Sequence, residues 1–385
     1  MMNSVGNVQL MQRLNRIKVM QYIRKFSPVS RNQLAVNTNL SLSSITNIVN
    51  FLLENKLVVE VGRLDTEGAG RRATLLEFNP GAKHIISVNI EPHEVQAALT
   101  DLSGNIFVFN KAAIDKKSDA DRVLKMVEKE ISKLMRKSDL VIAVGISLPG
   151  HISNGMGIVN SSILQWKNVD VKGRIEKAFA LPLYIINNSI NKAMCAFRNM
   201  CGDNKNNVVF LDLVLGIDLV SFYNGRINES VTGELGHTTV IKDGPKCFCG
   251  NRGCLELVCS EEHVVGNYRE ITGNKASELD EIFKLAEKGD KTAKQVLKEA
   301  AEYLGISIAN IVSLFEPEKI IINKNRLISC PFIYKTALKE ANERGYNLMF
   351  KHVVYECVSV SDVQAIQGLS QYSADRIFAL DGNVL

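Results

Sequence analysis

A histidine and three cysteines near the middle of the chain have the types and the spacing of metal ligands. They are His237, Cys247, Cys249 and Cys254. Thiolates and imidazoles are preferred ligands of Zn²⁺, and three Cys with one His fill all four positions of a tetrahedral structural site. Gly250 and Gly253 relieve the steric limits on a loop that turns back to face one ion. Reduced cysteines beside a core histidine are the alternative, which this spacing disfavours, so we expect a structural zinc ion.

Two carboxylates flank the cluster, Glu234 before it and Glu256 after it. Because four protein ligands leave the metal no open position, such a loop is better suited to holding these groups in place than to activating water. We therefore consider them candidate ligand-binding groups. Solvated loop carboxylates are the alternative interpretation.

Length and composition limit the possible classes of protein. At 385 residues the chain should divide into two or three compact units. It has no N-terminal apolar segment typical of a signal peptide and no apolar run long enough to span a bilayer, so we expect a cytoplasmic protein without a membrane partner. The five cysteines outside the cluster show no disulfide framework. They are Cys195, Cys201, Cys259, Cys330 and Cys357.

The positive charge is concentrated at the N-terminal end. Residues 1–80 contain ten Lys or Arg and five Asp or Glu, whereas the remaining chain has equal numbers of basic and acidic residues. A small basic module on a larger neutral body indicates a polyanionic partner for the first part alone.

The same N-terminal residues show the spacing of a helix-turn-helix. Apolar residues recur at helical spacing from Val8 to Phe26, Ser30 precedes a short second helix, and a third helix is expected from Leu42 to Asn55. The apolar stripe of the third helix contains Leu42, Ile45, Val49 and Leu52. Its polar face carries Ser43, Ser44 and Asn47, which we predict to contact bases in the major groove of double-stranded DNA.

Two strands after Leu57 are joined by a glycine-rich hairpin that has the character of a wing. The hairpin carries Arg71 and Arg72, which could enter an A·T-rich minor groove, while Arg31 and Lys56 could contact phosphates. A three-helix module with a solvated polar face and a solvated turn remains the alternative.

The rest of the chain alternates strands and helices as an α/β protein does. Asn79-Pro80-Gly81 is the expected boundary of the N-terminal domain at residues 1–80. Two groups of strands, each followed by helices, predict two lobes with a cleft between them, at 81–195 and 196–361. A C-terminal helix over 362–380 is expected to pack back on the first lobe.

Over essentially its whole length, the sequence resembles the ROK family of bacterial repressors and sugar kinases. The residues that carry the resemblance are S-R-N-Q-L-A, G-A-G-R-R, S-L-P-G, N-N-S-I-N, G-E-L-G-H, C-F-C-G-N-R-G-C-L-E and E-P-E-K-I-I-I. The resemblance implies a winged helix-turn-helix followed by a two-lobed, actin-like body of the sugar kinase and ribonuclease H-like type. It also implies a homodimer or dimer of dimers. The implied sugar site contains Asn188, Glu234, His237 and Glu256, with His237 shared between sugar and zinc.

The departures from the kinase pattern are informative. Kinases of the family have Asp-x-Gly-Gly-Thr at the first phosphate loop, where this chain has Asn89-Ile90-Glu91-Pro92-His93. The second phosphate loop contains Asp218. The glycine pair that lies near the adenine in those kinases is replaced by Asn323-Lys324. Ser189 stands at the position of the catalytic aspartate. Because loss of a general base typically costs about 10²-fold to 10⁴-fold in rate, these changes predict a protein that is not an enzyme.

We therefore expect a sugar-responsive regulator of transcription, most often a repressor in this family. A carbohydrate kinase that carries a DNA-binding domain is the main alternative. A zinc-stabilised DNA-binding protein without a small ligand is the other.

Overall fold

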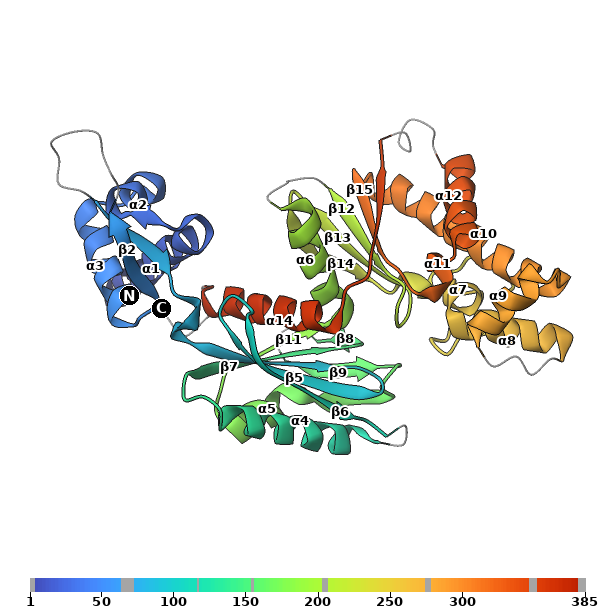
Figure 1. The fold of residues 1–385 in the computed structure, drawn as a ribbon, viewed down its shortest axis with the longest axis horizontal. Coiled ribbons are helices and arrows are strands. Elements are labelled where there is room, and N and C mark those ends of the chain that lie inside the picture. The colour runs from blue at the N-terminus through green and yellow to red at the C-terminus, as the bar shows by residue number, and fades with distance from the viewer. Residues whose placement is uncertain are drawn as a thin grey trace. The chain divides into compact units, whose positions relative to one another are not determined.

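The computed structural model describes seven stretches of the chain, in two compact units (Figure 1). The described residues are 4–63, 73–115, 118–153, 156–202, 207–273, 278–345 and 352–379. The first unit comprises Met1–Asn191 and Asp362–Leu385, and the second comprises Lys192–Ser361. Among these described stretches, no helix is both long and apolar enough to cross a membrane.

The N-terminal part of the first unit is a winged helix-turn-helix, as predicted. It consists of α1 (Ser4–Phe26), β1 (Val29–Ser30), α2 (Arg31–Thr38), α3 (Leu42–Glu54), β2 (Val58–Arg63) and β3 (Thr74–Phe78), with sheet order β1-β3-β2. The Ser30 side chain accepts a hydrogen bond from the Gln33 backbone, and Gln33 bonds back to Ser30, so α2 begins with a capping box. Asn39 ends α2 in the left-handed region at φ 55°, and Ser41 caps α3.

The buried face of α3 differs in part from the expected stripe. Ile45, Val49 and Leu52 are buried as predicted, and Ile48 is buried with them. Leu42 is 51% exposed, because it is the first residue of α3 and precedes the turns that pack on the module's core. The hairpin tip that contains Arg71 and Arg72 lies outside the described residues.

An α/β layer follows in the first unit. Its sheet has the order β11-β7-β4-β5-β6, and β5 alone runs antiparallel to its neighbours. The helices α4 and α5 contact one face, and α14 covers the other (Figure 1). These elements are β4 (His84–Ile90), β5 (Glu94–Asp101), β6 (Ile106–Ala113), α4 (Ala120–Met135), β7 (Val141–Leu148), α5 (Val171–Phe179), β11 (Leu183–Asn187) and α14 (Asp362–Ile377). A small sheet of β8 (His151–Ile152), β9 (Ile158–Ser161) and β10 (Trp166–Asp170) lies between β7 and α5 in sequence.

The winged helix-turn-helix module shares a hydrophobic core with this α/β layer. Side chains of α1, α3 and β3 form one buried cluster with Ile85, Ala143, Ile377 and Phe378. The Phe378 ring meets Phe78 edge to face, with the ring centroids 6.4 Å apart. The contact between the C-terminal residues and the module therefore has a buried apolar centre.

The second unit repeats the sheet order of the first. Its order β14-β13-β12-β15-β16 again places the first strand at the centre, with only β13 antiparallel to its neighbours. The strands are β12 (Val208–Asp212), β13 (Asp218–Tyr223), β14 (Arg226–Gly233), β15 (Lys319–Asn323) and β16 (Val354–Val358). The helices are α7 (Glu256–Cys259), α8 (Glu261–Thr272), α9 (Leu279–Glu287), α10 (Lys291–Phe315), α11 (Arg326–Ser329) and α12 (Pro331–Arg344), while α6 (Asn188–Cys201) spans the division of the chain. The predicted actin-like, two-lobed body is confirmed.

Candidate functional site

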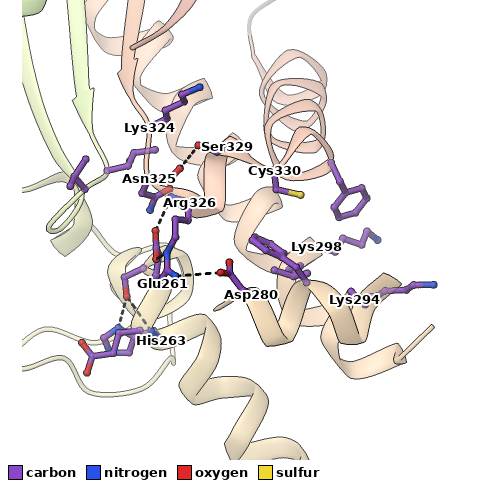
Figure 2. A pocket seen from close by; sticks show the side chains of 18 of the residues that line it. Glu261, His263, Asp280, Lys294, Lys298, Lys324, Asn325, Arg326, Ser329 and Cys330 are labelled. Carbon is purple, nitrogen blue, oxygen red and sulfur yellow. Dashed lines mark hydrogen bonds and ion pairs between the residues drawn. The ribbon is translucent and has the colours of Figure 1, made fainter. Parts of the chain in front are cut away.

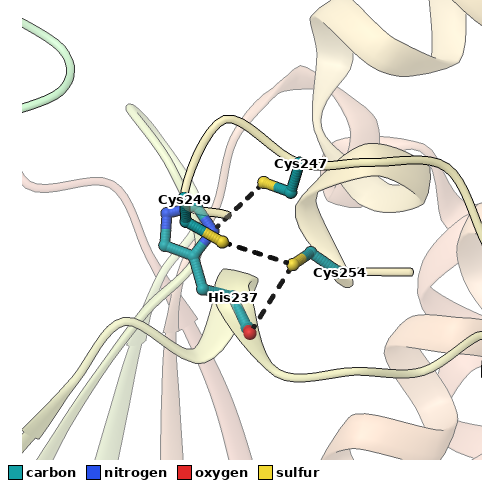
Figure 3. A group of neighbouring side chains, drawn as sticks. All are labelled: His237, Cys247, Cys249 and Cys254. Carbon is teal, nitrogen blue, oxygen red and sulfur yellow. Dashed lines mark hydrogen bonds between the residues drawn. The ribbon is translucent and has the colours of Figure 1, made fainter. Parts of the chain in front are cut away.

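The structure brings the predicted metal ligands together in the second unit. Figure 3 shows three thiols and an imidazole facing one another. Their four ligand atoms lie within 4.8 Å of one another. Cys249 Sγ is 3.7 Å from Cys254 Sγ, and Cys247 Sγ is 3.6 Å from His237 Nδ1. Zn–S and Zn–N bonds of about 2.3 and 2.0 Å give tetrahedral edges of about 3.5 to 3.8 Å, so this donor set fits a tetrahedral ion.

The loop around the cluster depends on a glycine. Gly253 has φ 65°, and a Cβ atom there would lie 1.7 Å from the backbone oxygen of Ile241. No other residue avoids this collision without moving the backbone. The close approach brings Cys254 beside Thr239, with which it forms an isolated β-bridge. His237 lies in the short helix η2 (Leu235–His237), just before this segment.

The three thiols differ in exposure, and burial disfavours the thiolate form of Cys254. Cys247 and Cys254 are buried, whereas Cys249 is exposed. Burial raises the pKa of Cys254 to about 12. Without a cation this thiol therefore keeps its proton at neutral pH, and metal binding must displace that proton.

The two flanking carboxylates lie on the other side of the imidazole. His237 Nε2 is 3.5 Å from Glu234 Oε2 and 3.6 Å from Glu256 Oε2, while Nδ1 faces the thiols. Burial raises the pKa of Glu256, and Glu234 is exposed. The exposed Phe248 ring lies nearly perpendicular to the imidazole, with the ring centroids 5.0 Å apart. Two of the predicted ligand-binding residues thus lie beside one ring nitrogen of the third.

The fourth predicted ligand-binding residue, Asn188, belongs to the first unit. It begins α6 and is 2% exposed. Its amide oxygen accepts a hydrogen bond of 2.5 Å from Ser147 Oγ, and its Nδ2 donates to the Ile90 carbonyl at 3.2 Å. Ser189 is buried beside it, and its backbone N–H donates to Asn187 Oδ1 at 2.7 Å.

A large cavity in the second unit was not predicted from the sequence. It has a volume of about 1370 Å³ and is lined by apolar residues such as Phe283 and Phe332 and by charged ones (Figure 2). Within it, the Arg326 guanidinium donates to Glu261 at 2.9 Å and lies 3.9 Å from Asp280. The lining residues come from several separated segments between positions 213 and 332, so no local pattern identifies them.

The residues where the kinase glycine pair would lie are Asn323 and Lys324. Asn323 Nδ2 donates to the buried Asp212 carboxylate at 2.9 Å, and Lys192 Nζ approaches the same carboxylate at 3.6 Å. The Asn323 side chain is therefore part of a buried polar network, whereas Lys324 lines the cavity.

The predicted base-contacting residues lie at the N-terminal half of α3. Ser43 and Asn47 are exposed. Ser44 is half-buried, and its hydroxyl is 2.8 Å from Ser41 Oγ at the helix cap. The Ser43 hydroxyl also lies 3.0 Å from Ser41 Oγ, so the cap holds both serine hydroxyls, while Asn47 projects from the exposed face of α3.

The predicted phosphate contacts differ in their surroundings. Arg31 Nη2 donates to Glu60 Oε1 at 3.1 Å, which sequence reasoning missed because the partner lies on β2. Lys56 is exposed and follows α3 at φ 58°.

The chain thus joins a winged helix-turn-helix to a two-lobed, actin-like body. The sequence pattern described as the ROK family matches residues 85–370, so the chain belongs to the ROK family. This confirms the expected family.

Relatives and solved structures support this placement. The xylose repressor of Bacillus spizizenii is 29% identical over 348 residues, covering 89% of this chain and 90% of that protein. The DNA-binding transcriptional dual regulator NagC of Escherichia coli is 27% identical over 333 residues, covering 83% of this chain and 82% of that protein. A ROK family transcriptional regulator described as a homologue of E. coli MLC superposes with a TM-score of 0.80 at 24% identity, covering 96% and 98% of the two chains. The ROK hexokinase of Thermus thermophilus superposes with a TM-score of 0.64 at 19% identity, covering 75% of this chain and 97% of that chain.

Proposed function

We propose that this protein is a sugar-responsive transcriptional regulator that represses by binding an operator in double-stranded DNA. The observation that carries the proposal is the winged helix-turn-helix, whose α3 exposes polar side chains and whose core continues into an actin-like lobe. The repressor names of the xylose and N-acetylglucosamine relatives support the same function. A regulator that binds the DNA of a bacterium must reach it in the cytoplasm, so we propose a cytoplasmic location.

Base contacts are assigned to Ser43 and Asn47. Asn can pair bidentately with adenine, whereas Ser is permissive, so direct readout by α3 is modest. Much of the affinity then comes from phosphate contacts, to which Lys56 and the basic excess of the module contribute. We propose that a homodimer binds an inverted repeat. One small module contacts few base pairs, so two copies are needed to recognise a longer operator.

The small ligand is a sugar, assigned to Asn188, Glu234, His237 and Glu256, the residues that the family resemblance implies. Carboxylates accept strong charge-assisted hydrogen bonds from hydroxyl groups, and the imidazole edge lies beside both acids. The xylose relative suggests a monosaccharide ligand.

The body binds this sugar without phosphorylating it. Ser189 offers no carboxylate to accept a hydroxyl proton, and a serine needs an activating partner to act as a base. Asp218 would repel a polyphosphate in the second loop. A carbohydrate kinase with an attached DNA-binding module is the competing function.

Zinc is assigned to His237, Cys247, Cys249 and Cys254, which fit a tetrahedral ion in type and spacing. A zinc ion bound there would cross-link the loop that carries Glu234 and Glu256 and so fix its conformation. The imidazole is then fixed through Nδ1, which leaves its Nε2–H directed at the two carboxylates.

Selection of DNA by the full-length protein tests the function. Duplexes recovered from a random pool should carry two half-sites in an inverted repeat. In mobility-shift titrations at fixed salt, one of a panel of monosaccharides should then weaken binding to a selected duplex. Incubation with ATP and the same sugars should give no turnover at ordinary enzyme rates. Sugar phosphorylation at such rates without sequence-selective DNA binding would favour the kinase and refute the proposal.

A further inference from the structure

The first helix of the chain places an arginine against α3, the helix to which base contacts are assigned. The Arg16 guanidinium carbon lies 3.8 Å from the centroid of the Phe51 ring. Phe51 belongs to α3, whereas Arg16 belongs to α1. A cation at the face of an aromatic ring is attracted by the ring quadrupole. The charged end of Arg16 is therefore held at the side of α3.

The hydrogen-bonding capacity of Arg16 is unused within the described part of the chain. A guanidinium carries five N–H donors in its plane, so a ring against its face leaves these donors to bond at the edge. Among the described residues, the Arg16 side chain forms no hydrogen bond or ion pair with a carboxylate. Arg24 and Arg31, in contrast, pair with Asp375 and Glu60. The half-buried Arg16 is thus a cation that still lacks an anionic partner.

Phe51 places this cation beside the base-contacting line of α3. Phe51 follows Asn47 by four residues, so it lies one turn further along and about 40° around the helix axis. A helix with its side chains is about 10 to 12 Å wide and the major groove is about 12 Å wide. The sides of an inserted helix therefore lie close to the phosphates at the groove edges. Arg16 is held where such a phosphate passes when Asn47 reaches a base.

A second arginine on α1 adds to the positive charge there. Arg13 precedes Arg16 by three residues, a spacing that places both side chains on one face of the helix. Arg13 is half-buried, and its Nη2 has no hydrogen-bond partner among the described residues. Glu54, the acidic residue of α3, is exposed and pairs with neither arginine in the described stretches. The two charges are therefore not neutralised by this carboxylate, and their combined field attracts an anion.

We infer that Arg16 contacts a backbone phosphate at the edge of the major groove and that Phe51 holds its guanidinium in position for this contact. The inference rests on the proposed function, because it assumes that α3 enters the groove. Arginine forms strong, charge-assisted hydrogen bonds with phosphate oxygens. A phosphate contact positions the module without reading bases, so Arg16 contributes affinity and salt dependence, whereas Asn47 contributes base preference.

Mobility-shift titrations of the full-length protein over a series of salt concentrations test the inference. The probes are a duplex selected from a random pool and a duplex of scrambled sequence. Arg16→Met keeps an unbranched apolar side chain against Phe51 but removes the charge and the donors. The slope of log K against log salt should become shallower by about 0.9 for each protomer on the DNA, equivalent to about eightfold in affinity between 0.1 and 1 M salt. The ratio of the affinities for the two duplexes should stay unchanged.

Lys25→Gln is the matched control, because it removes one positive charge from the opposite face of the same helix, nine residues after Arg16. It should leave the slope as in the parent. Arg16→Gln should lower the slope as Arg16→Met does, and it tests the inference if Arg16→Met does not fold. Arg16→Lys should restore most of the slope, since an ammonium group still attracts phosphate as a point charge.

The outcomes separate the inference from the function. If Arg16→Met and Arg16→Gln keep the parent's slope, or change the preference between duplexes instead, the inference is wrong and the regulator function stands. If the parent binds both duplexes equally, with a slope that Arg16→Met lowers, the phosphate contact holds and sequence-selective regulation is refuted. If the parent binds neither duplex, both are refuted.

Discussion

Replacing Phe378 with alanine should destabilise the DNA-binding module, although the residue lies near the other end of the chain. Phe378 is fully buried, its ring meets Phe78 edge to face, and the Arg24 guanidinium lies 5.1 Å from its centroid. The Arg24 side chain also pairs with Asp375 at 2.9 Å. The ring therefore fills a junction between α1, β3 and the end of α14.

The expected loss follows from burial. Deleting a buried phenyl ring typically costs about 3 to 5 kcal/mol, because the transfer free energy is lost and a cavity remains. The aromatic pair contributes about 0.5 to 1.5 kcal/mol beyond its area, and the cation–π contact about 0.5 to 1 kcal/mol at a partly exposed site. Since these contributions overlap in a single truncation, we expect a loss of about 4 kcal/mol.

Native-state hydrogen exchange is the appropriate assay, because a chain of two units need not unfold in one step. Amide protons of α1 and β3 should open with a free energy about 4 kcal/mol lower in Phe378→Ala than in the parent. Phe332→Ala is the control, since Phe332 is 52% exposed and lies in the second unit. A loss below about 1 kcal/mol in Phe378→Ala would show that the junction does not stabilise the module.

The remaining predictions concern the metal and the DNA. Purified protein should contain about one zinc per chain, and Cys249→Ser should lose the metal together with stability. Because burial raises the pKa of Cys254 to about 12, zinc binding releases its proton, so a chromogenic chelator should extract zinc more readily as the pH falls. Asn47→Ala should cost roughly 1 to 3 kcal/mol of DNA affinity and relax one adenine preference per half-site, measured by mobility shift. Asn37→Ala on α2 should leave that preference intact, and equal base preferences in the Asn47 variant and the parent would contradict the assignment.

The features that were predictable are those encoded locally. The metal ligands lie in one short segment, so their residue types and spacing are sufficient to predict the cluster. The capping box at Ser30 and the alternating apolar runs likewise define elements from neighbouring residues.

The features that were missed depend on residues distant in sequence. Glu91 and Asn188 meet only because β4 and β11 end at the same edge of one sheet, with β7 between them. The Arg31–Glu60 pair forms because β2 brings Glu60 close to the start of α2. Helical periodicity in the sequence does not predict where that strand lies. The cavity lined by Phe283 and Phe332 has the same origin, since its walls come from separate helices.

The path of the chain has a consequence for biosynthesis. The second unit, Lys192–Ser361, is an insertion within the first, which is completed only when α14 returns to its sheet. The core of the DNA-binding module includes Phe378, so the rest of this core leaves the ribosome roughly 300 residues before its last buried side chain does. At about 5 to 20 residues per second, that interval is about 15 to 60 s. A chain that stops before Phe378 should therefore carry a destabilised winged helix-turn-helix.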